Sequence, residues 1–352
     1  MTDALVSVVL TNHDYGHLLE QAIQSVLAQT YRAVELVVVD DGSTDGSGAV
    51  LDRYASQARV LRQPNRGQAA ALDAGVAACG GDILCFLDAD DIWQPTKIAR
   101  VAATLAAQPR AAWLRHPLEV VDDRLAPLGT RVPRIHRTRL HRLEPRLVAE
   151  RILTASMSGF VLRRELAERV FPLVGGALPA TEQDFPLPGG APPATGQDFP
   201  LPGRALPAVG RDFRLDADAL LLARCARERP WGCSLAEPLG MYRRHGRQTF
   251  ARPEDMKRLL ERQIEVGTAL AGILGLREPS TNFKHLAVLA HLEGGSGAWQ
   301  GRAAAFLRGA AATLPLASRP RSLARQLGAL TYAAGAPASW LRRLRAEQAL
   351  PD

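Results

Sequence analysis

Apolar stretches of strand length alternate with helical patterns through the first 120 residues of the chain. Apart from Ser7, the stretches are apolar throughout, and the strands they predict cover residues 6–10, 36–39, 60–61 and 83–87. Between them, apolar residues recur at helical spacing, and the helices this predicts cover residues 17–29, 47–54 and 67–78. Strands without polar alternation belong inside a parallel sheet that helices cover on both faces. The pattern therefore predicts an α/β fold with a mostly parallel, doubly wound sheet.

The chain repeats itself between Phe171 and Phe213. Phenylalanines recur at 171, 185, 199 and 213, and the sequence Gln-Asp-Phe-Pro-Leu-Pro-Gly at 183–189 returns at 197–203. Proline and glycine at this density prevent a helix or a central strand. We interpret the 14-residue repeat as a tandem duplication that lengthened a surface loop, with no chemistry of its own.

The composition changes after residue 250 to Ala, Leu and Arg with helical periodicity. Helices are predicted there over residues 254–274, 282–293, 298–314 and 322–333. We therefore divide the chain into a catalytic-type domain, residues 1–250, and a basic helical region, residues 251–352. The second region holds 14 Lys/Arg against 8 Asp/Glu, within a net charge of +7 for the chain. A solvated basic surface and peripheral contact with an anionic membrane are both open interpretations.

Composition and cysteine usage bound the class of protein. With 47% hydrophobic and 22% charged residues, the 352-residue chain has the composition of a globular protein that buries a core. No apolar run is long enough to span a bilayer, and no signal-peptide pattern opens the sequence. The four cysteines show no zinc or redox spacing, so we expect reduced thiols and a cytoplasmic location.

Three acidic motifs are candidates for chemistry, and the first follows the predicted strand at 36–39. Asp40 and Asp41 lead into Gly42-Ser43-Thr44-Asp45-Gly46, where carboxylates can accept hydrogen bonds from a base or ribose. A turn that caps the next helix, with Asp45 or Ser47 as N-cap, is the structural alternative.

The second motif, Asp88-Ala89-Asp90-Asp91, follows the predicted strand at 83–87. Asp88 and Asp90 can face one divalent cation, whose preferred ligands are oxygens and which keeps positions open for phosphate. Asp91 can instead serve in a helix-capping turn before Pro95. The third motif holds Asp216 and Asp218 at the start of an apolar helical stretch, as helix cap or as general base.

In order and spacing these motifs resemble inverting glycosyltransferases of family 2, which have the GT-A fold. The resemblance covers residues 6–124 and resumes at 158–164 and 216–246. It is carried by the following segments: Ser25-Val26-Leu27-Ala28-Gln29-Thr30-Tyr31, residues 40–46, Asn65-Arg66-Gly67 and residues 87–91.

The resemblance implies a role for each of several residues. It assigns nucleotide binding to Thr11, Asp40, Asp41, Asn65, Arg66, Gly67 and Asp88. It assigns a Mn²⁺ or Mg²⁺ ion to Asp90, Asp88 and His245, and the diphosphate to Arg243 and Arg244. It assigns the general base to Asp218, with Asp216 as the alternative. Asp73 stands where asparagine is common, which we expect to be tolerated.

The function implied is inverting, metal-dependent transfer of a sugar from a nucleotide-sugar donor, most often a uridine diphosphate sugar. The acceptor would be a glycan or lipid-linked hydroxyl in bacterial polysaccharide, glycolipid or cell-envelope synthesis, and nucleic acid is not an expected partner. A nucleotidyltransferase is disfavoured because no Gly-rich phosphate loop follows the first predicted strand. A catalytically inactive nucleotide-binding scaffold acting through its C-terminal helices stays open as the alternative.

Overall fold

The computed structural model describes residues 4–145, 148, 155–174, 217–245 and 274. The 14-residue repeats, Asp216 and the C-terminal region apart from Leu274 lie outside the described residues. The predictions made for them are therefore not tested here.

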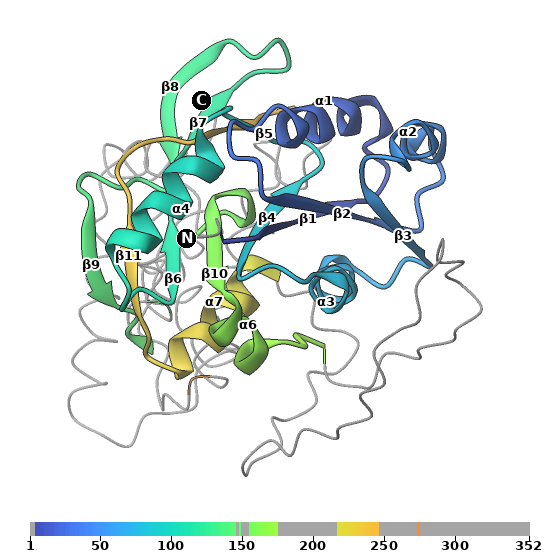
Figure 1. The fold of residues 1–352 in the computed structure, drawn as a ribbon. Coiled ribbons are helices and arrows are strands. Elements are labelled where there is room, and N and C mark those ends of the chain that lie inside the picture. The colour runs from blue at the N-terminus through green and yellow to red at the C-terminus, as the bar shows by residue number, and fades with distance from the viewer. Residues whose placement is uncertain (1–3, 146–147, 149–154, 175–216, 246–273, 275–352) are drawn as a thin grey trace, which may run out of the picture.

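The N-terminal half confirms the predicted alternation of strands and helices. Its elements in chain order are β1 (Val6–Asn12), α1 (Gly16–Leu27), β2 (Val34–Asp41), α2 (Ser47–Tyr54), β3 (Arg59–Gln63), α3 (Gln68–Ala78) and β4 (Ile83–Asp88). Strands β1 to β4 are mutually parallel where they pair, in the order β3-β2-β1-β4 (Figure 1). Helices α1 and α2 cover one face of these strands and α3 covers the other (Figure 1).

The sheet continues beyond β4 with strands from the second half of the described chain. These elements are α4 (Lys97–Ala107), β6 (Trp113–Arg115), β9 (Arg139–Arg142), η1 (Met157–Gly159), β10 (Phe160–Arg163), α6 (Arg164–Val170), α7 (Ala217–Arg227) and β11 (Trp231–Ser234). The full order is β3-β2-β1-β4-β10-β6-β11-β9, and β10 runs antiparallel to both of its neighbours. The edge strand β9 also runs antiparallel to its neighbour β11, so the sheet is mostly parallel with two reversed strands, β10 and β9.

A second, four-stranded sheet, which the sequence did not predict, stands beside the end of β4. It pairs β5 (Ile92–Trp93), β12 (Gly240–Arg243), β7 (Leu118–Val121) and β8 (Pro127–Val132) in that order. β5 follows β4 after only three residues, so this sheet fixes the loop that carries Asp90 and Asp91.

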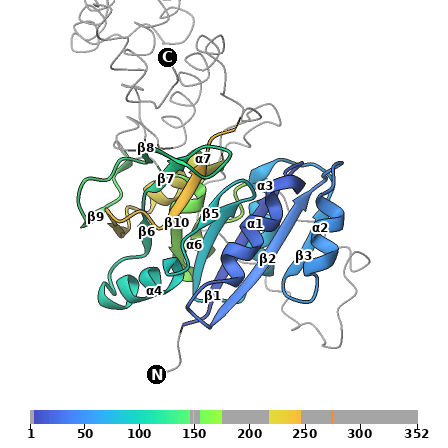
Figure 2. The same cartoon turned by 90° about the horizontal axis from the view of Figure 1, so that it is seen from above.

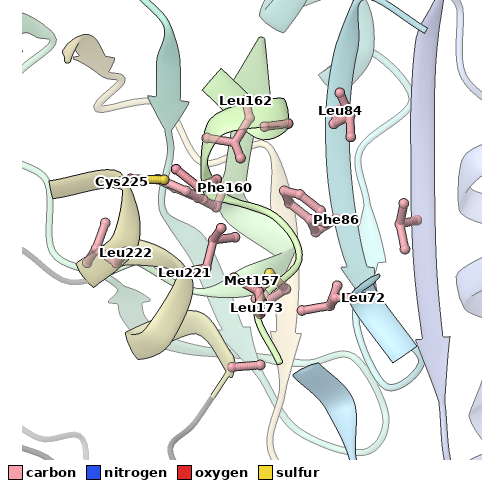
Figure 3. Close-up of a cluster of buried hydrophobic side chains, with 14 of the residues drawn as sticks. Leu72, Leu84, Phe86, Met157, Phe160, Leu162, Leu173, Leu221, Leu222 and Cys225 are labelled. Atoms are coloured by element: carbon pink, nitrogen blue, oxygen red, sulfur yellow. The ribbon is translucent and has the colours of Figure 1, made fainter. Parts of the chain in front are cut away.

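Alternate residues of the central strands supply two hydrophobic cores, one on each face of the main sheet. Leu84 and Phe86 of β4 pack with α3, α6 and α7, while Cys85 and Leu87 pack with α1 and α4. Figure 3 shows the first core, in which Phe86 faces Leu72 of α3. Burial on both faces is what the uninterrupted apolar runs predict.

All four cysteines are buried and unpaired, as expected of reduced thiols. Among the described residues, no helix combines the length and apolar character that crossing a membrane requires.

Lys97, the first residue of α4, is fully buried next to the loop after β4. Its Nζ has no hydrogen-bond partner and lies 2.9 Å from the ring centroid of Trp93. Burial lowers its pKa to about 7, opposed only by the nearby thiol of Cys85. The neighbouring His116 is also fully buried, and its pKa is lowered to about 3, first by burial and then by Lys97. The cation–π contact stabilises the ammonium by about 2 kcal/mol, less than the desolvation opposing it.

Replacing Lys97 by methionine is therefore expected to raise the free energy of unfolding at pH 7 by about 2 kcal/mol. The unfolded lysine holds its proton up to about pH 10.5 whereas the folded one releases it near pH 7. The free energy of unfolding of wild type should therefore increase as pH rises from 7 to 10, because the unfolded state binds the extra proton. The methionine variant should not show this increase. Urea titrations of both proteins across this range measure it. A variant that is less stable at every pH would show that the ammonium is a net stabiliser.

Candidate active site

The predicted nucleotide-binding residues converge at the carboxyl ends of the parallel strands. Thr11 of β1 is in register with Val39 of β2 and with Asp88 of β4, and Asn12 is in register with Asp40. Asp41 ends β2 and Asp88 ends β4. Side chains far apart in the sequence thus share one edge of the sheet, where ligands of doubly wound folds bind.

Asp40 is buried and organises the loop that follows β1. Its Oδ1 accepts hydrogen bonds from Asn12 Nδ2 at 2.8 Å and from Ser43 Oγ at 2.5 Å. Asp45, a few residues on, joins two helix starts. One of its oxygens accepts from Ser47 N and the other from Gly16 N, both at 2.8 Å. Asp45 thus supports the starts of α1 and α2, but the N-cap residue of α2 is Gly46, so the prediction of Asp45 or Ser47 as N-cap is wrong.

Asp41 fixes the Asn65-Arg66-Gly67 segment against the end of β2. Its Oδ1 accepts hydrogen bonds from Gln63 Nε2 at 2.7 Å and Arg66 N at 2.9 Å, and its Oδ2 accepts from Gly67 N at 2.8 Å. Asn65 Nδ2 lies 3.0 Å from His13 Nε2 of the loop after β1. A carboxylate has room for about four hydrogen bonds, so Oδ2 keeps acceptor capacity for a ligand. Two loops that could enclose a nucleoside are thereby held together.

Gly42 permits this close approach, which a side chain would prevent. Its φ is +73°, and a Cβ built there would lie 2.5 Å from Asn65 N. Gly42→Ala is therefore expected to lower the free energy of unfolding by about 2 kcal/mol and to displace the 65–67 segment. Gly48→Ala in α2 is the matched control, because a Cβ there meets nothing within 4 Å. Chemical denaturation of both variants tests this, and equal stabilities would contradict it.

Asp88 lies at the centre of a cluster of carboxylates. Its Oδ1 accepts a hydrogen bond from Gln68 Nε2 at 2.6 Å, and its backbone N–H donates to Ser158 Oγ at 3.0 Å. Burial, together with the charges of Asp90 and then Asp218, raises its pKa to about 8. Asp218 contributes to the pKa of Asp88 although it lies 130 positions later in the sequence, on α7. The structure therefore brings the candidate base to the acidic loop.

Asp90 and His245 are in direct contact. His245 Nε2 lies 3.1 Å from Asp90 Oδ2, and both side chains are largely buried. The ring of Tyr15 packs edge-on against His245, with 5.4 Å between the ring centroids. Carboxylate and imidazole groups are both common metal ligands, and here the two lie together on one side of the cluster.

Asp91 and Arg243 join the acidic loop to β12. Asp91 is 1% exposed, and its Oδ1 accepts a hydrogen bond from the backbone N–H of Arg243 at 3.2 Å. Its pKa is raised by burial and by its acidic neighbours Asp90 and Asp88. Asp91 does not cap the following helix, since the N-cap of α4 is Thr96. Its observed contact secures β12 instead.

The guanidinium of Arg243 is engaged with protein groups. It donates to the backbone oxygens of Asp90 at 3.2 Å and Asp123 at 3.4 Å, and to Gln21 Oε1 at 2.6 Å. Arg243 is also buried, so it braces the acidic loop in this structure. Arg244, which is partly exposed, remains the stronger candidate for the diphosphate. The prediction from sequence did not separate the two arginines, because two adjacent arginines look equivalent in sequence although only Arg243 is buried.

Asp218 lies in the first turn of α7, and its Oδ1 accepts a hydrogen bond from the N–H of Ala219 at 2.7 Å. The charges of Asp91, Asp90, Asp88 and Asp218 all help to raise the pKa of the buried Tyr242 hydroxyl, after burial itself. Tyr242 and Gln68 were not among the predicted site residues. Neither belongs to an acidic motif, so only the folded arrangement identifies them.

The donor set fits a divalent cation that a bound nucleotide would help to hold. Among the described residues, no three His, Cys, Asp or Glu side chains are arranged to hold a metal ion by themselves. Mg²⁺ and similar ions are usually bound through one or two carboxylates and substrate phosphates rather than in a cage made only of protein groups. Asp90 with His245, and Asp88 nearby, meet that requirement, and a cation would relieve the repulsion that raises the pKa of Asp88.

The N-terminal part of the chain, which carries much of this candidate site, is similar to known proteins. Residues 7–171 match the sequence profile of Glycosyl transferase family 2. An uncharacterized glycosyltransferase of Nostoc, alr2836, is 35% identical over 181 residues, which is 48% of this chain and 53% of the relative. The glycosyltransferase GlyG of Streptococcus pneumoniae is 40% identical over 92 residues, or 25% of this chain and 31% of the relative. The chain thus spans about half the length, or less, of these curated relatives.

Among solved structures, TarS 1–349 of S. aureus in complex with UDP-GlcNAc superposes with a TM-score of 0.52. The superposition covers 94% of this chain and 82% of that one at 15% sequence identity, so it shows the fold alone. The predicted GT-A fold is confirmed. The profile match and the relatives thus identify residues 7–171 as a glycosyl transferase family 2 domain.

Proposed function

We propose that this chain transfers a sugar from a nucleoside-diphosphate sugar to a hydroxyl acceptor, with inversion and with a bound divalent cation. The observation that supports the proposal is that Asp41 and Asp88 end the strands on either side of β1, with Asp90 in the loop after β4 and Asp218 near enough to raise the pKa of Asp88. Residues 1–250 would form the catalytic domain, with residues 251–352 an appended helical region. The transfer reaction would take place in the cytoplasm, at the inner face of the membrane, with a glycan or lipid-linked acceptor.

The nucleoside end of the donor would lie between the loops that Asp41 holds together. Asp40, Asp41 and Asn65 offer hydrogen-bonding groups to base and ribose, and Thr11 lies between them and Asp88 in the sheet register. The TarS structure contains a uridine diphosphate sugar, which supports uridine as the first nucleoside to test.

The diphosphate would lie between Asp90 and Arg244. Asp90, Asp88 and His245 would hold the cation, and Arg244 would contribute a further positive charge. A Mn²⁺ or Mg²⁺ ion in this place supplies Lewis-acid stabilisation of the charge that develops on the leaving nucleoside diphosphate.

Asp218 would act as the general base. It would accept the proton of the acceptor hydroxyl while that oxygen attacks the anomeric carbon on the face opposite the leaving group. The anomeric C–O bond to the diphosphate breaks as the new glycosidic bond forms, so the configuration inverts. Asp216 is the alternative base.

Nucleoside diphosphate release from a panel of uridine, guanosine and thymidine diphosphate sugars tests the proposal. We expect release from one donor class with Mn²⁺ or Mg²⁺, and none with a chelator. Nucleotide binding without turnover, on every donor and acceptor tried, would instead identify a non-catalytic scaffold.

Inversion has its own test in donor hydrolysis, where water replaces the acceptor. Proton NMR during the first minutes should show the sugar released with the anomeric configuration opposite to that of the donor. Release with the donor's configuration would exclude a single displacement by Asp218-activated water.

A further inference from the structure

A basic arm, residues 124–142, runs from the tip of the β7–β8 hairpin to the end of β9. Its 19 residues contain two histidines and six arginines and no aspartate or glutamate, although Asp122 and Asp123 precede it in the turn of the hairpin. The arginines are Arg124, Arg131, Arg134, Arg137, Arg139 and Arg142, all of which are exposed. The arm therefore carries a formal charge of +6, about as much as the whole C-terminal region.

The hairpin at the start of the arm also exposes apolar side chains. Leu125 is 37% exposed and Leu128 is 45% exposed, and they are two of the five large hydrophobic residues exposed in the described part of the chain. Leu125 has a φ of +65°, a conformation that costs free energy for a residue with a side chain. Figure 1 shows this hairpin projecting from the body of the molecule.

Protection of sheet edges explains only part of this pattern. β8 and β9 are edge strands, and charged side chains on such strands discourage pairing with other chains. Edge protection does not explain the exposed leucines, which oppose it. The net positive charge of the arm and its exposed leucines therefore point to a partner that is both anionic and apolar.

We infer that the basic arm docks on an anionic lipid bilayer, with its arginines against the headgroup phosphates and Leu125 and Leu128 at the acyl boundary. Charge complementarity favours this partner, because each arginine near an anionic membrane surface contributes about 1 kcal/mol of attraction. A soluble polyanion would satisfy the arginines and leave Leu125 and Leu128 in water. A bilayer accommodates both kinds of side chain at one surface.

The arm is attached directly to the candidate active site. β7 pairs with β12 through Glu119↔Met241, Val120↔Tyr242 and Val121↔Arg243. The backbone N–H of Arg244 also donates to Val121 O at 2.8 Å, and Arg243 Nη1 donates to Asp123 O at 3.4 Å. Docking through the arm would hold the site at a fixed distance from the lipid. If the proposed function is correct, that placement suits an acceptor anchored in the same membrane.

Flotation of the full chain with lipid vesicles tests the inference without requiring catalysis. We expect binding to vesicles of phosphatidylcholine with phosphatidylglycerol and little binding to phosphatidylcholine alone, with affinity falling as salt rises. Replacing Arg131, Arg134 and Arg137 by glutamine should lower the partition coefficient about a hundredfold. Leu125→Ser with Leu128→Ser should lower it about tenfold or more.

The matched control removes the same charge elsewhere. Arg32→Gln, Arg59→Gln and Arg227→Gln lie outside the arm and are exposed, so this triple variant should bind vesicles nearly as well as wild type. Thermal unfolding of each variant checks that the fold is intact. The inference is overturned if wild type ignores anionic vesicles or if the arm variants bind them like the control. It is also overturned if the leucine variant keeps full binding, which would show that charge alone binds the vesicle and that the leucines do not enter the bilayer.

Discussion

Asp90→Asn is expected to lower kcat/KM for sugar transfer by about a thousandfold, equivalent to about 4 kcal/mol of transition-state stabilisation. The substitution keeps the size of the side chain and removes the charge that faces His245 at 3.1 Å. The leaving diphosphate would then lose its main means of charge neutralisation. Initial rates of variant and wild type over a range of donor concentrations, at saturating Mn²⁺, give kcat/KM for both proteins.

Folding provides the control for this variant. The negative charge of Asp90 helps to raise the pKa of both Asp88 and Asp91, so removing it relieves repulsion between buried carboxylates. The melting temperature of Asp90→Asn should therefore equal or exceed that of wild type. Asp82→Asn, at an exposed carboxylate away from the cluster, should leave activity unchanged. A full loss of activity in Asp82→Asn, or full activity in Asp90→Asn, would contradict the assignment.

Asp218→Asn is expected to lower kcat by about a hundredfold to ten-thousandfold while nucleotide binding stays unchanged. The asparagine oxygen can still accept the hydrogen bond from Ala219 N, so the first turn of α7 should keep its structure. What is lost is the group that takes the proton of the acceptor hydroxyl. Turnover measured beside calorimetric titration with nucleotide separates this effect from a loss of donor binding.

Asp216→Asn decides between the two candidate bases. Asp216 lies outside the described residues, so its position gives no preference, whereas the electrostatic effect of Asp218 on Asp88 favours Asp218. We expect Asp216→Asn to retain most of the wild-type kcat. The reverse outcome, a large loss at position 216 and none at 218, would transfer the role of base to Asp216.

The fold was predictable from sequence where local pattern determines structure. β1, β2 and β4 contain nearly continuous apolar runs because their side chains are buried on both faces of the sheet, as Leu84 and Cys85 of β4 illustrate. The four-stranded sheet was not predictable in this way. β5 has two residues and pairs with β12, which lies nearly 150 residues later in the chain, so no local period indicates it.

The candidate site was predictable where acidic residues follow strands, since parallel strands bring their carboxyl ends to one edge. Sequence could not show that Arg243 is buried against Asp90 and Gln21. Two adjacent arginines look the same in sequence whichever of them points inward. It also could not show that Asp41 supports the 65–67 segment. That role depends on hydrogen bonds to backbone N–H groups of Arg66 and Gly67, which carry no signature in residue type.

The central claim is that a nucleoside diphosphate binds at this sheet edge through a cation held by Asp90. Calorimetric titration of the full chain with uridine, guanosine and thymidine diphosphates, each with Mn²⁺ and with a chelator, tests it most directly. We predict that wild type and Asp218→Asn bind one of these nucleotides only with Mn²⁺, and that Asp90→Asn loses that binding. Equal binding by wild type with Mn²⁺ and with chelator, or unchanged binding by Asp90→Asn, would contradict the account.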